Sequence, residues 1–283
     1  MSLNSINTNQ AAYVALQSLN STNSALQATQ KAVSTGFRVS DATDDGGAFA
    51  IAERVRSDVG ALTTVNQQLG NAKGLIGTTL TGLTGVSTLL KSARATLVTL
   101  ADGNTTGSQR TEAIQTYKQT LASIKSDIQG SDYNGKTLIG NITGSSGTFA
   151  KANLIRNEQG ATYGVATFSG SAFFGSLSFT GTQLNGAATV AGLISQGGIL
   201  LKKVDALGQQ LNTYGAASNF IDNQTTFNSN KIDSLNSGLG SLIDADLTKE
   251  AARLQSLQIK QQLGTQALSL ANQAPSSLIS LFK

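Results

Sequence analysis

The chain has 283 residues, of which 13% are charged, and 20 Lys and Arg against 16 Asp and Glu give a net charge of +4. Charged residues are about half as frequent as the ~25% of typical globular proteins. The chain contains no His and no Cys. This excludes imidazole bases, thiol nucleophiles, disulfides and zinc sites built on either side chain. The basic residues are scattered, which argues against a nucleic-acid partner.

The first segment, Ser2–Gln30, contains no charged side chain. It lacks the positive start and continuous apolar run of a signal peptide, and no stretch reaches the ~20 apolar residues of a membrane span. Its apolar residues recur at seven-residue spacing on a seam that is half polar, so the helix it forms is marginal alone. We expect this helix to become ordered on assembly. The candidate self-assembly residues here are Leu3, Ile6, Ala12, Leu16, Leu19, Leu26 and Val33.

An acidic loop follows, with the sequence "DATDDGG" over Asp41–Gly47. Three carboxylates suggest calcium, but the spacing of a calcium loop is not met and Ala52 stands where the twelfth-position Glu belongs. We therefore predict no metal site. The acids are expected to precede a helix that begins near Ala48, where they favour the positive end of its dipole.

Three later segments have the 4-3 apolar spacing of long helices or coiled coils: 55–97, 114–128 and 200–242. Glycines at 70, 74, 77, 82 and 85 weaken the first of these by ~1 kcal/mol each relative to Ala. Neighbouring elements must therefore hold that segment helical.

Between Lys136 and about Val190 the helical period is lost and Phe, Thr, Val and Gly increase. We predict short antiparallel hairpins there. "GSDYNGKT", Gly130–Thr137, fits a phosphate-loop pattern, but its context is inverted, so Asn134-Gly135 is assigned to a hairpin turn. Hydroxyls that are candidates for O-glycosylation are Ser145, Ser146, Thr148, Ser169 and Ser171, and aromatic residues that could stack on sugars are Tyr163, Phe168, Phe173, Phe174 and Phe179.

The last segment, Gln261–Phe282, is again free of charge. Its candidate self-assembly residues are Leu247, Leu254, Leu257, Leu263, Leu268, Ala271, Leu278 and Leu281. In a polymer, each charged residue would be repeated around one axis in a poorly hydrated space, where its desolvation is costly. Ends without charge are therefore suited to burial against copies of the same chain. A heterologous contact of that kind continues into an open filament unless its rotation closes.

Two terminal motifs and one internal motif resemble those of bacterial flagellins. They are "RVSDATDDGGAFAIAERV" (38–55), "SLIDADLTKEAARLQSLQIKQQLGTQALSLANQAPSSLISLFK" (241–283) and "SDYNGKTLIG" (131–140). The family-motif residues of the acidic loop are Arg38, Asp41, Asp44, Asp45, Gly46 and Gly47. The resemblance covers about residues 1–140 and 195–283.

The resemblance implies a mainly α fold: a long, antiparallel, coiled-coil-like helical rod with a small β-hairpin insert. Its parts are an N-terminal inner-tube helix and connector (1–43), long rod helices (44–130), an outward-facing hairpin insert (131–194), a returning helix (195–240) and a C-terminal inner-tube helix (241–283). It implies a filament subunit for swimming motility, without catalytic residues or cofactors.

Export through the flagellar type III apparatus to an extracellular filament is also implied. The partners would be the chain itself, a cap, a hook–filament junction protein and the export apparatus or a chaperone. Ser92 and Ala95 depart from the epitope of the animal innate receptor around Arg94, so weak recognition is predicted. The alternatives are a junction protein, or a flagellin-like protein that binds carbohydrate at the cell surface.

Overall fold

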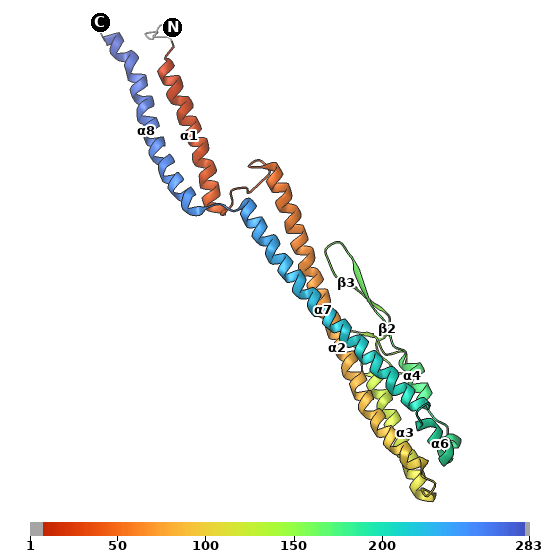
Figure 1. The fold of residues 1–283 in the computed structure, drawn as a ribbon. Helices are drawn as coiled ribbons and strands as arrows, with labels where there is room; N and C mark the ends of the chain where they lie inside the picture. The colour runs from red at the N-terminus through yellow and green to blue at the C-terminus, as the bar shows by residue number, and fades with distance from the viewer. Residues whose placement is uncertain (1–7, 281–283) are drawn as a thin grey trace. The chain divides into compact units, whose positions relative to one another are not determined.

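The computed structural model describes residues 8–280, with side chains described up to Gln273. Long helices dominate this part of the chain, and strands are few and short (Figure 1). The elements in order are α1 (Gln10–Thr35), α2 (Gly46–Ala101), α3 (Gly107–Gln129), β1 (Lys136–Thr137), β2 (Thr148–Phe149), β3 (Ala152–Ile155), β4 (Thr162–Val165), α4 (Gly170–Leu177), α5 (Gly181–Asn185), α6 (Ala187–Ile194), α7 (Ile199–Ile243) and α8 (Leu247–Ser280). The prediction of a mainly helical fold with a small β insert is confirmed.

The chain forms two structural units. The first combines the chain up to Val59 with the chain from Asp233 onward, and the second is Gly60–Ile232. The first unit contains α1, α8, the connectors and the adjoining ends of α2 and α7. The second contains the rest of α2 and α7, together with α3 and the insert.

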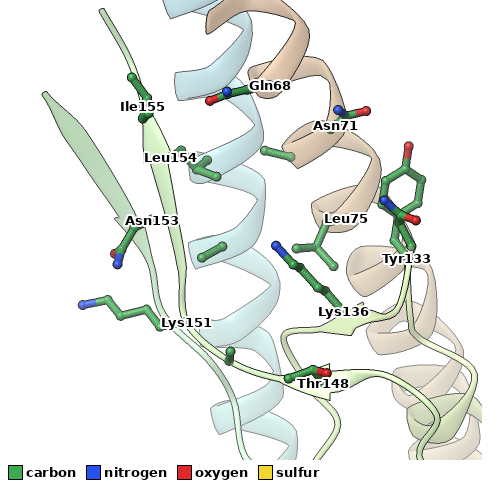
Figure 2. A pocket seen from close by; sticks show the side chains of 14 residues that line it. Gln68, Asn71, Leu75, Tyr133, Lys136, Thr148, Lys151, Asn153, Leu154 and Ile155 are labelled. Carbon is green, nitrogen blue, oxygen red and sulfur yellow. The ribbon is translucent and has the colours of Figure 1, made fainter. Parts of the chain in front are cut away.

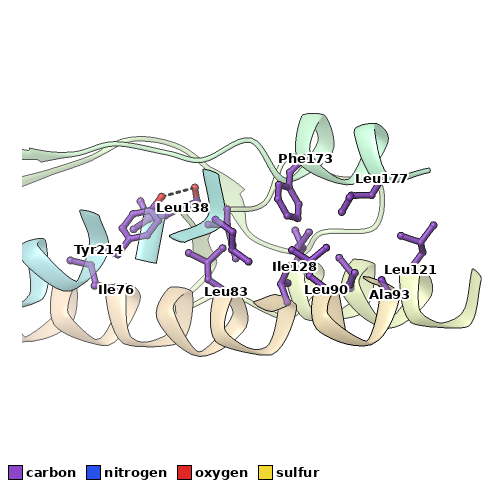
Figure 3. Close-up of a cluster of buried hydrophobic side chains, with 14 of the residues drawn as sticks. Ile76, Leu83, Leu90, Ala93, Leu121, Ile128, Leu138, Phe173, Leu177 and Tyr214 are labelled. Atoms are coloured by element: carbon purple, nitrogen blue, oxygen red, sulfur yellow. Dashed lines mark hydrogen bonds between the residues drawn. The ribbon is translucent and has the colours of Figure 1, made fainter. Parts of the chain in front are cut away.

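The core of the second unit is built from the heptad seams of α2, α3 and α7, as the spacing predicts. Within this unit α2 and α7 are antiparallel, because Lys73 pairs with Asp222 while Asn66 lies against Asn228. Figure 3 shows the seam side chains meeting those of the insert. Fully or nearly fully buried members include Ile76, Leu83, Leu90, Leu97, Ile124, Ile128, Leu138, Phe173, Leu177 and Tyr214.

Two buried tyrosines connect this core to the insert by hydrogen bonds. Tyr117 of α3 donates its hydroxyl to the carbonyl of Leu177 at 2.7 Å, and Tyr214 of α7 donates to that of Ala166 at 3.0 Å. Burial raises the pKa of Tyr214 to about 12, so the hydroxyl keeps the proton that it donates. The pairing satisfies phenol groups that would otherwise be costly to bury.

Three glycines of α2 let α3 and the following turn approach closely. A Cβ at Gly74 would lie 2.6 Å from the Tyr133 ring, and one at Gly82 would lie 1.8 Å from Ser131 Oγ. At Gly85 it would lie 2.5 Å from an Asp127 carboxylate oxygen. The loss of helix propensity at these positions is therefore offset by packing that no larger residue allows.

The carbonyls at the end of α2 are satisfied by one arginine. The guanidinium of Arg110 donates to the carbonyls of Leu100 at 2.8 Å and Asp102 at 3.3 Å, and also to Thr105 at 2.9 Å. Its remaining bond reaches the carbonyl of Leu184 in α5 at 2.8 Å. A cation at a helix C-terminus is also favoured by the helix dipole. Arg110 thus joins the α2–α3 connection to the insert.

The insert contains less β structure than the sequence predicts. β3 and β4 form an antiparallel hairpin, and Asn134 (φ 48°) and Gly135 (φ 72°) form the predicted two-residue turn between Tyr133 and Lys136. However, β1 and β2 pair in parallel. The prediction of hairpins is also wrong for residues 172–181, with the sequence "AFFGSLSFTG".

That stretch forms α4 and the start of α5, because local caps favour helix. Ser169 Oγ accepts from Ala172 N, and Thr180 and Gln183 form a reciprocal capping box. Phe173 and Leu177, four residues apart, then bury one face of α4. Two turns are too short to show a 3.6-residue period in the sequence.

Candidate self-assembly surface

The charge-free ends of the chain pair with each other in the first unit. α1 and α8 lie side by side and antiparallel (Figure 1), since Asn9 Nδ2 donates to the carbonyl of Ala271 and Gln261 Nε2 donates to Asn23 Oδ1. Asn9 also caps α1 by accepting from Ala12 N at 3.0 Å. Uncharged amides therefore form the polar contacts along this pair.

The buried seam of the pair contains about half of the predicted self-assembly residues. On α8 the less exposed positions follow a strict 4-3 spacing, and Leu257 is the most buried at 8% exposure. Gly264 allows close approach, because a Cβ there would lie 3.2 Å from Leu19 Cδ1. The predicted residues that lie on this seam are Ala12, Leu19, Leu26, Leu254, Leu257, Leu268 and Ala271.

Other predicted residues point away from the seam. Leu16 is 44% exposed, Leu247 51%, Leu263 57% and Val33 37%. These apolar side chains have no cover within the described chain. Leu3, Ile6 and Leu281 lie outside the described residues, and so does the side chain of Leu278.

Further exposed apolar residues, outside the predicted set, lie on the same helices. Tyr13 is 69% exposed, and Val14, Ile259 and Leu270 are between 58% and 67%. On α8, Ile259, Leu263 and Leu270 follow i, i+4, i+11 spacing and so share one face. The sequence contains this second apolar stripe, but its spacing alone does not distinguish it from the seam. α8 thus has one apolar stripe that packs on α1 and another that faces outward.

The two connectors of the first unit bond to each other beside this pair. Arg38 N and Val39 N both donate to the carbonyl of Ile243, and Ala245 N donates to that of Gly36. The Arg38 guanidinium adds a bond to the carbonyl of Leu242. A small apolar cluster packs where the two connectors meet. Its buried members are Val39, Ala48, Ala52 and Ile243, and Phe49, Leu239 and Leu242 pack against them.

The aspartates of the acidic loop make two kinds of contact: one caps a helix, and the other two form ion pairs. Asp45 Oδ1 accepts from Gly47 N and Ala48 N, both at 3.0 Å, so it caps α2 as predicted. Asp41 and Asp44 instead form ion pairs with Lys31 at 2.5 Å and 2.8 Å. Gly46 and Gly47 begin α2.

The ion pairs of this loop shift the pKa values of all three groups. Hydrogen bonds from Lys31, then from Thr43, lower the pKa of Asp41 to about 2, and Lys31 likewise lowers the pKa of Asp44. The two carboxylates raise the pKa of Lys31. Within the described residues, no group of three or more His, Cys, Asp or Glu is placed to hold a metal ion. Lys31, Asp41 and Asp44 thus form a structural cluster of ion pairs, the Lys31 clasp.

The candidate residues of the insert are placed differently from one another. Ser146 and Thr148 are exposed, whereas Ser145 Oγ is buried without a hydrogen-bond partner in the described chain. The aromatic residues considered for sugar stacking pack on the core, and Tyr163 stacks on Phe220 with centroids 4.1 Å apart. No helix in the described part of the chain is long and apolar enough to cross a membrane.

Comparison with known proteins assigns the two helical parts to one structural family. The bacterial flagellin N-terminal helical region matches residues 6–143, and the flagellin C-terminal helical region matches residues 199–282. The chain is 34% identical to flagellin FljM of Caulobacter vibrioides over the whole of both chains. It is 33% identical to a flagellin of Brucella melitensis, covering 99% of each chain.

These matches define the chain as a helical structural protein of filaments. The chain belongs to the bacterial flagellin family and is a flagellar filament subunit. Full-length similarity to flagellins favours this function over that of a junction protein. The crystal structure of Bacillus cereus flagellin is also similar, with a TM-score of 0.47 at 17% identity over 57% of this chain and 88% of that chain.

Proposed function

We propose that the outward apolar faces of α1 and α8 are the contacts through which this subunit polymerises. The observation that carries the proposal is the exposure of Leu16, Leu263 and Leu270 on helices whose paired ends carry no charge. Burying a leucine stabilises a contact by about 1.5–3 kcal/mol. A copy of the same pair is a suitable partner, because its charge-free stretches, within residues 2–30 and 261–282, present leucines and uncharged amides and no ion to desolvate.

Polymerisation through these faces also accounts for the missing charge. In a filament, equivalent residues of many copies come close around one axis, so a single lysine would be repeated as a ring of like charges. Such a ring is costly in a poorly hydrated interior. Amides such as Gln261 and Asn23 form hydrogen bonds without that cost.

The wider setting follows from family membership. The proposed partners are other copies, a filament cap, a hook–filament junction protein, and the export apparatus or a chaperone. The proposed location is the extracellular filament, reached by the flagellar type III route. The proposed role is structural and requires no catalysis, since flagellins are a structural family.

Seeded polymerisation read by electron microscopy tests this proposal. The full chain is compared with a chain trimmed to residues 45–240, after circular dichroism has established that the trimmed chain is helical. We expect only the full chain to extend the seeds. Equal growth of the trimmed chain would contradict the proposal, and a full chain that binds seeds without elongating would favour the junction protein.

A further inference from the structure

We propose that the second unit has a binding site for a small anionic polyol, independent of the polymerisation surface. A cavity of about 380 Å³ lies between α2 and the segment that runs from Tyr133 through β2 into β3 (Figure 2). Small-molecule sites typically enclose about 300–1,000 Å³. This cavity therefore suits a molecule of monosaccharide size.

The floor of the cavity is apolar and packs on the core. Ala72 and Leu75 come from one face of α2, where both are at most 7% exposed, and Leu154 of β3 packs against the same core. These side chains offer a surface for the carbon face of a sugar ring. A hydrophobic floor with a few placed polar groups is typical of small-molecule sites.

The charge of the cavity is positive. Lys136 and Lys151 are both among its lining residues, but only Lys136 points into it, and Lys151 points away from α2 (Figure 2). None of the lining residues, all within the described chain, is Asp or Glu. Neither lysine forms an ion pair with another described residue. Figure 2 shows Lys136 reaching into the space between α2 and β3. An anionic group in the ligand would supply the missing counter-charge.

The rim supplies groups that bind hydroxyls. Gln68 and Asn71 line the cavity from α2, and Asn134 and Tyr133 from the turn, whereas Asn153 of β3 points away from α2 (Figure 2). The side chains of Gln68 and Asn71 form no hydrogen bond with other described residues. Each primary amide both donates and accepts, as a sugar hydroxyl does. The rim therefore favours a polyol over a bare inorganic anion.

Lys136 is also the lysine of the phosphate-loop pattern at Gly130–Thr137. The structure does not form that loop, since α3 ends before the motif and Thr137 is only 1% exposed. An anion would therefore be bound by side chains rather than by a cradle of backbone amides. Carboxylate and phosphate both satisfy this chemistry, and the probes below distinguish them.

Ligand-observed NMR with the full-length free subunit tests the site. The probes are glucose 6-phosphate, glucuronate and neutral glucose, each at several concentrations. We expect binding of one or both anionic sugars with a Kd on the order of a millimolar, and glucose at least about tenfold weaker, because it lacks the charge-assisted bond. The relative affinity of the two anions identifies the preferred group.

Two variants and one control assign the binding to the cavity. Lys136→Gln removes the charge that points into the cavity, and Gln68→Ala separately removes one amide of its rim, whereas Lys118→Gln removes an exposed charge of α3 outside the cavity. We expect binding to weaken about tenfold or more in Lys136→Gln and to be unchanged in Lys118→Gln, with helical content preserved in all three. Gln68→Ala provides the readout if Lys136→Gln does not fold.

Three outcomes would overturn the inference. The first is equal binding of glucose and the anionic sugars, and the second is binding that neither cavity variant weakens. The third comes from repeating the titration with assembled filaments: loss of binding there would mean that a neighbouring copy covers the cavity. Failure of this site would leave the polymerisation proposal untouched, because no residue of α1 or α8 takes part.

Discussion

At the scale of single residues, the clasp around Lys31 determines how the end of α1 meets the connector. Lys31 bonds both Asp41 and Asp44, and Asp44 also accepts from Ser40 N. The groups are partly exposed, with side-chain exposures of 27–48%, so each pair contributes little to stability by itself. Its main effect is to hold one conformation of the loop.

The clasp gives the first unit a defined pH dependence. The pKa of Asp41 falls from 3.8 to about 2, so its stabilising contribution is present above pH 4 and is lost as the pH falls towards 2. Because the pKa of Lys31 is raised, the lysine contribution is lost only above pH 10.5. We expect Asp41→Asn to lower the thermal midpoint of the full chain at pH 7 but not at pH 2. If Asp41→Asn lowers the thermal midpoint equally at pH 7 and at pH 2, this account is contradicted.

The glycines of α2 give a second prediction at this scale. Gly82→Ala would force a methyl into Ser131, whose hydroxyl is bound to the carbonyl of Asp127 at 2.5 Å. We expect a loss of about 1–3 kcal/mol in the free energy of unfolding, as for overpacking elsewhere. Urea denaturation measures the change.

Gly77→Ala is the matched control. Nothing lies within 4 Å of a Cβ at this exposed position, so helix propensity alone applies. We expect a gain of about 0.5–1 kcal/mol. The packing explanation fails if the two substitutions change stability in the same direction.

At the scale of elements, the β3–β4 hairpin is attached to the helices by polar groups. Asn228 of α7 is completely buried and donates to Asn66 Oδ1 at 3.0 Å and to the carbonyl of Arg156 at 3.2 Å. Lys231 adds an ion pair with Glu158 just after β3, which lowers the pKa of that carboxyl. One buried amide therefore joins α2, α7 and the hairpin.

Removing that amide should loosen the hairpin selectively. We expect Asn228→Ala to cost about 1–3 kcal/mol, because buried partners lose their hydrogen bonds. Hydrogen exchange should increase at the amides of β3 and β4 more than at those of α3. Asn223→Ala, at an exposed position of the same helix, is the control and should change neither.

The sequence predicted these elements unevenly, for physical reasons. Heptad spacing located α2, α3 and α7, because burial on one face of a long helix repeats often enough to be recognised. The same reasoning missed α4 and α5, whose formation depends on caps at Ser169 and Thr180 rather than on periodicity. Spacing also could not distinguish the stripe of α8 that packs on α1 from the stripe that faces outward, since both are apolar.

At the scale of the whole molecule, the paired ends have the least burial to stabilise them. α1 has one fully buried side chain, Thr29, and its hydroxyl has no partner in the described chain. The second unit, by contrast, has an extended apolar core. We expect the amides of α1 and α8 to exchange faster than those of α3 in the free subunit, and to become protected in filaments. Equal protection in both states would contradict the prediction that these helices become ordered on assembly.

The central claim is that outward apolar side chains of α1 and α8, within the charge-free stretches at the two ends of the chain, cause polymerisation. The most direct test is the critical concentration for seeded growth of the full chain with Leu263→Gln, compared with Gln262→Ala at the neighbouring exposed position. Burial of a leucine is worth about 1.5–3 kcal/mol, so we predict a roughly tenfold or greater rise for Leu263→Gln and little change for the control. An unchanged critical concentration for Leu263→Gln, in filaments of normal appearance, would contradict the claim.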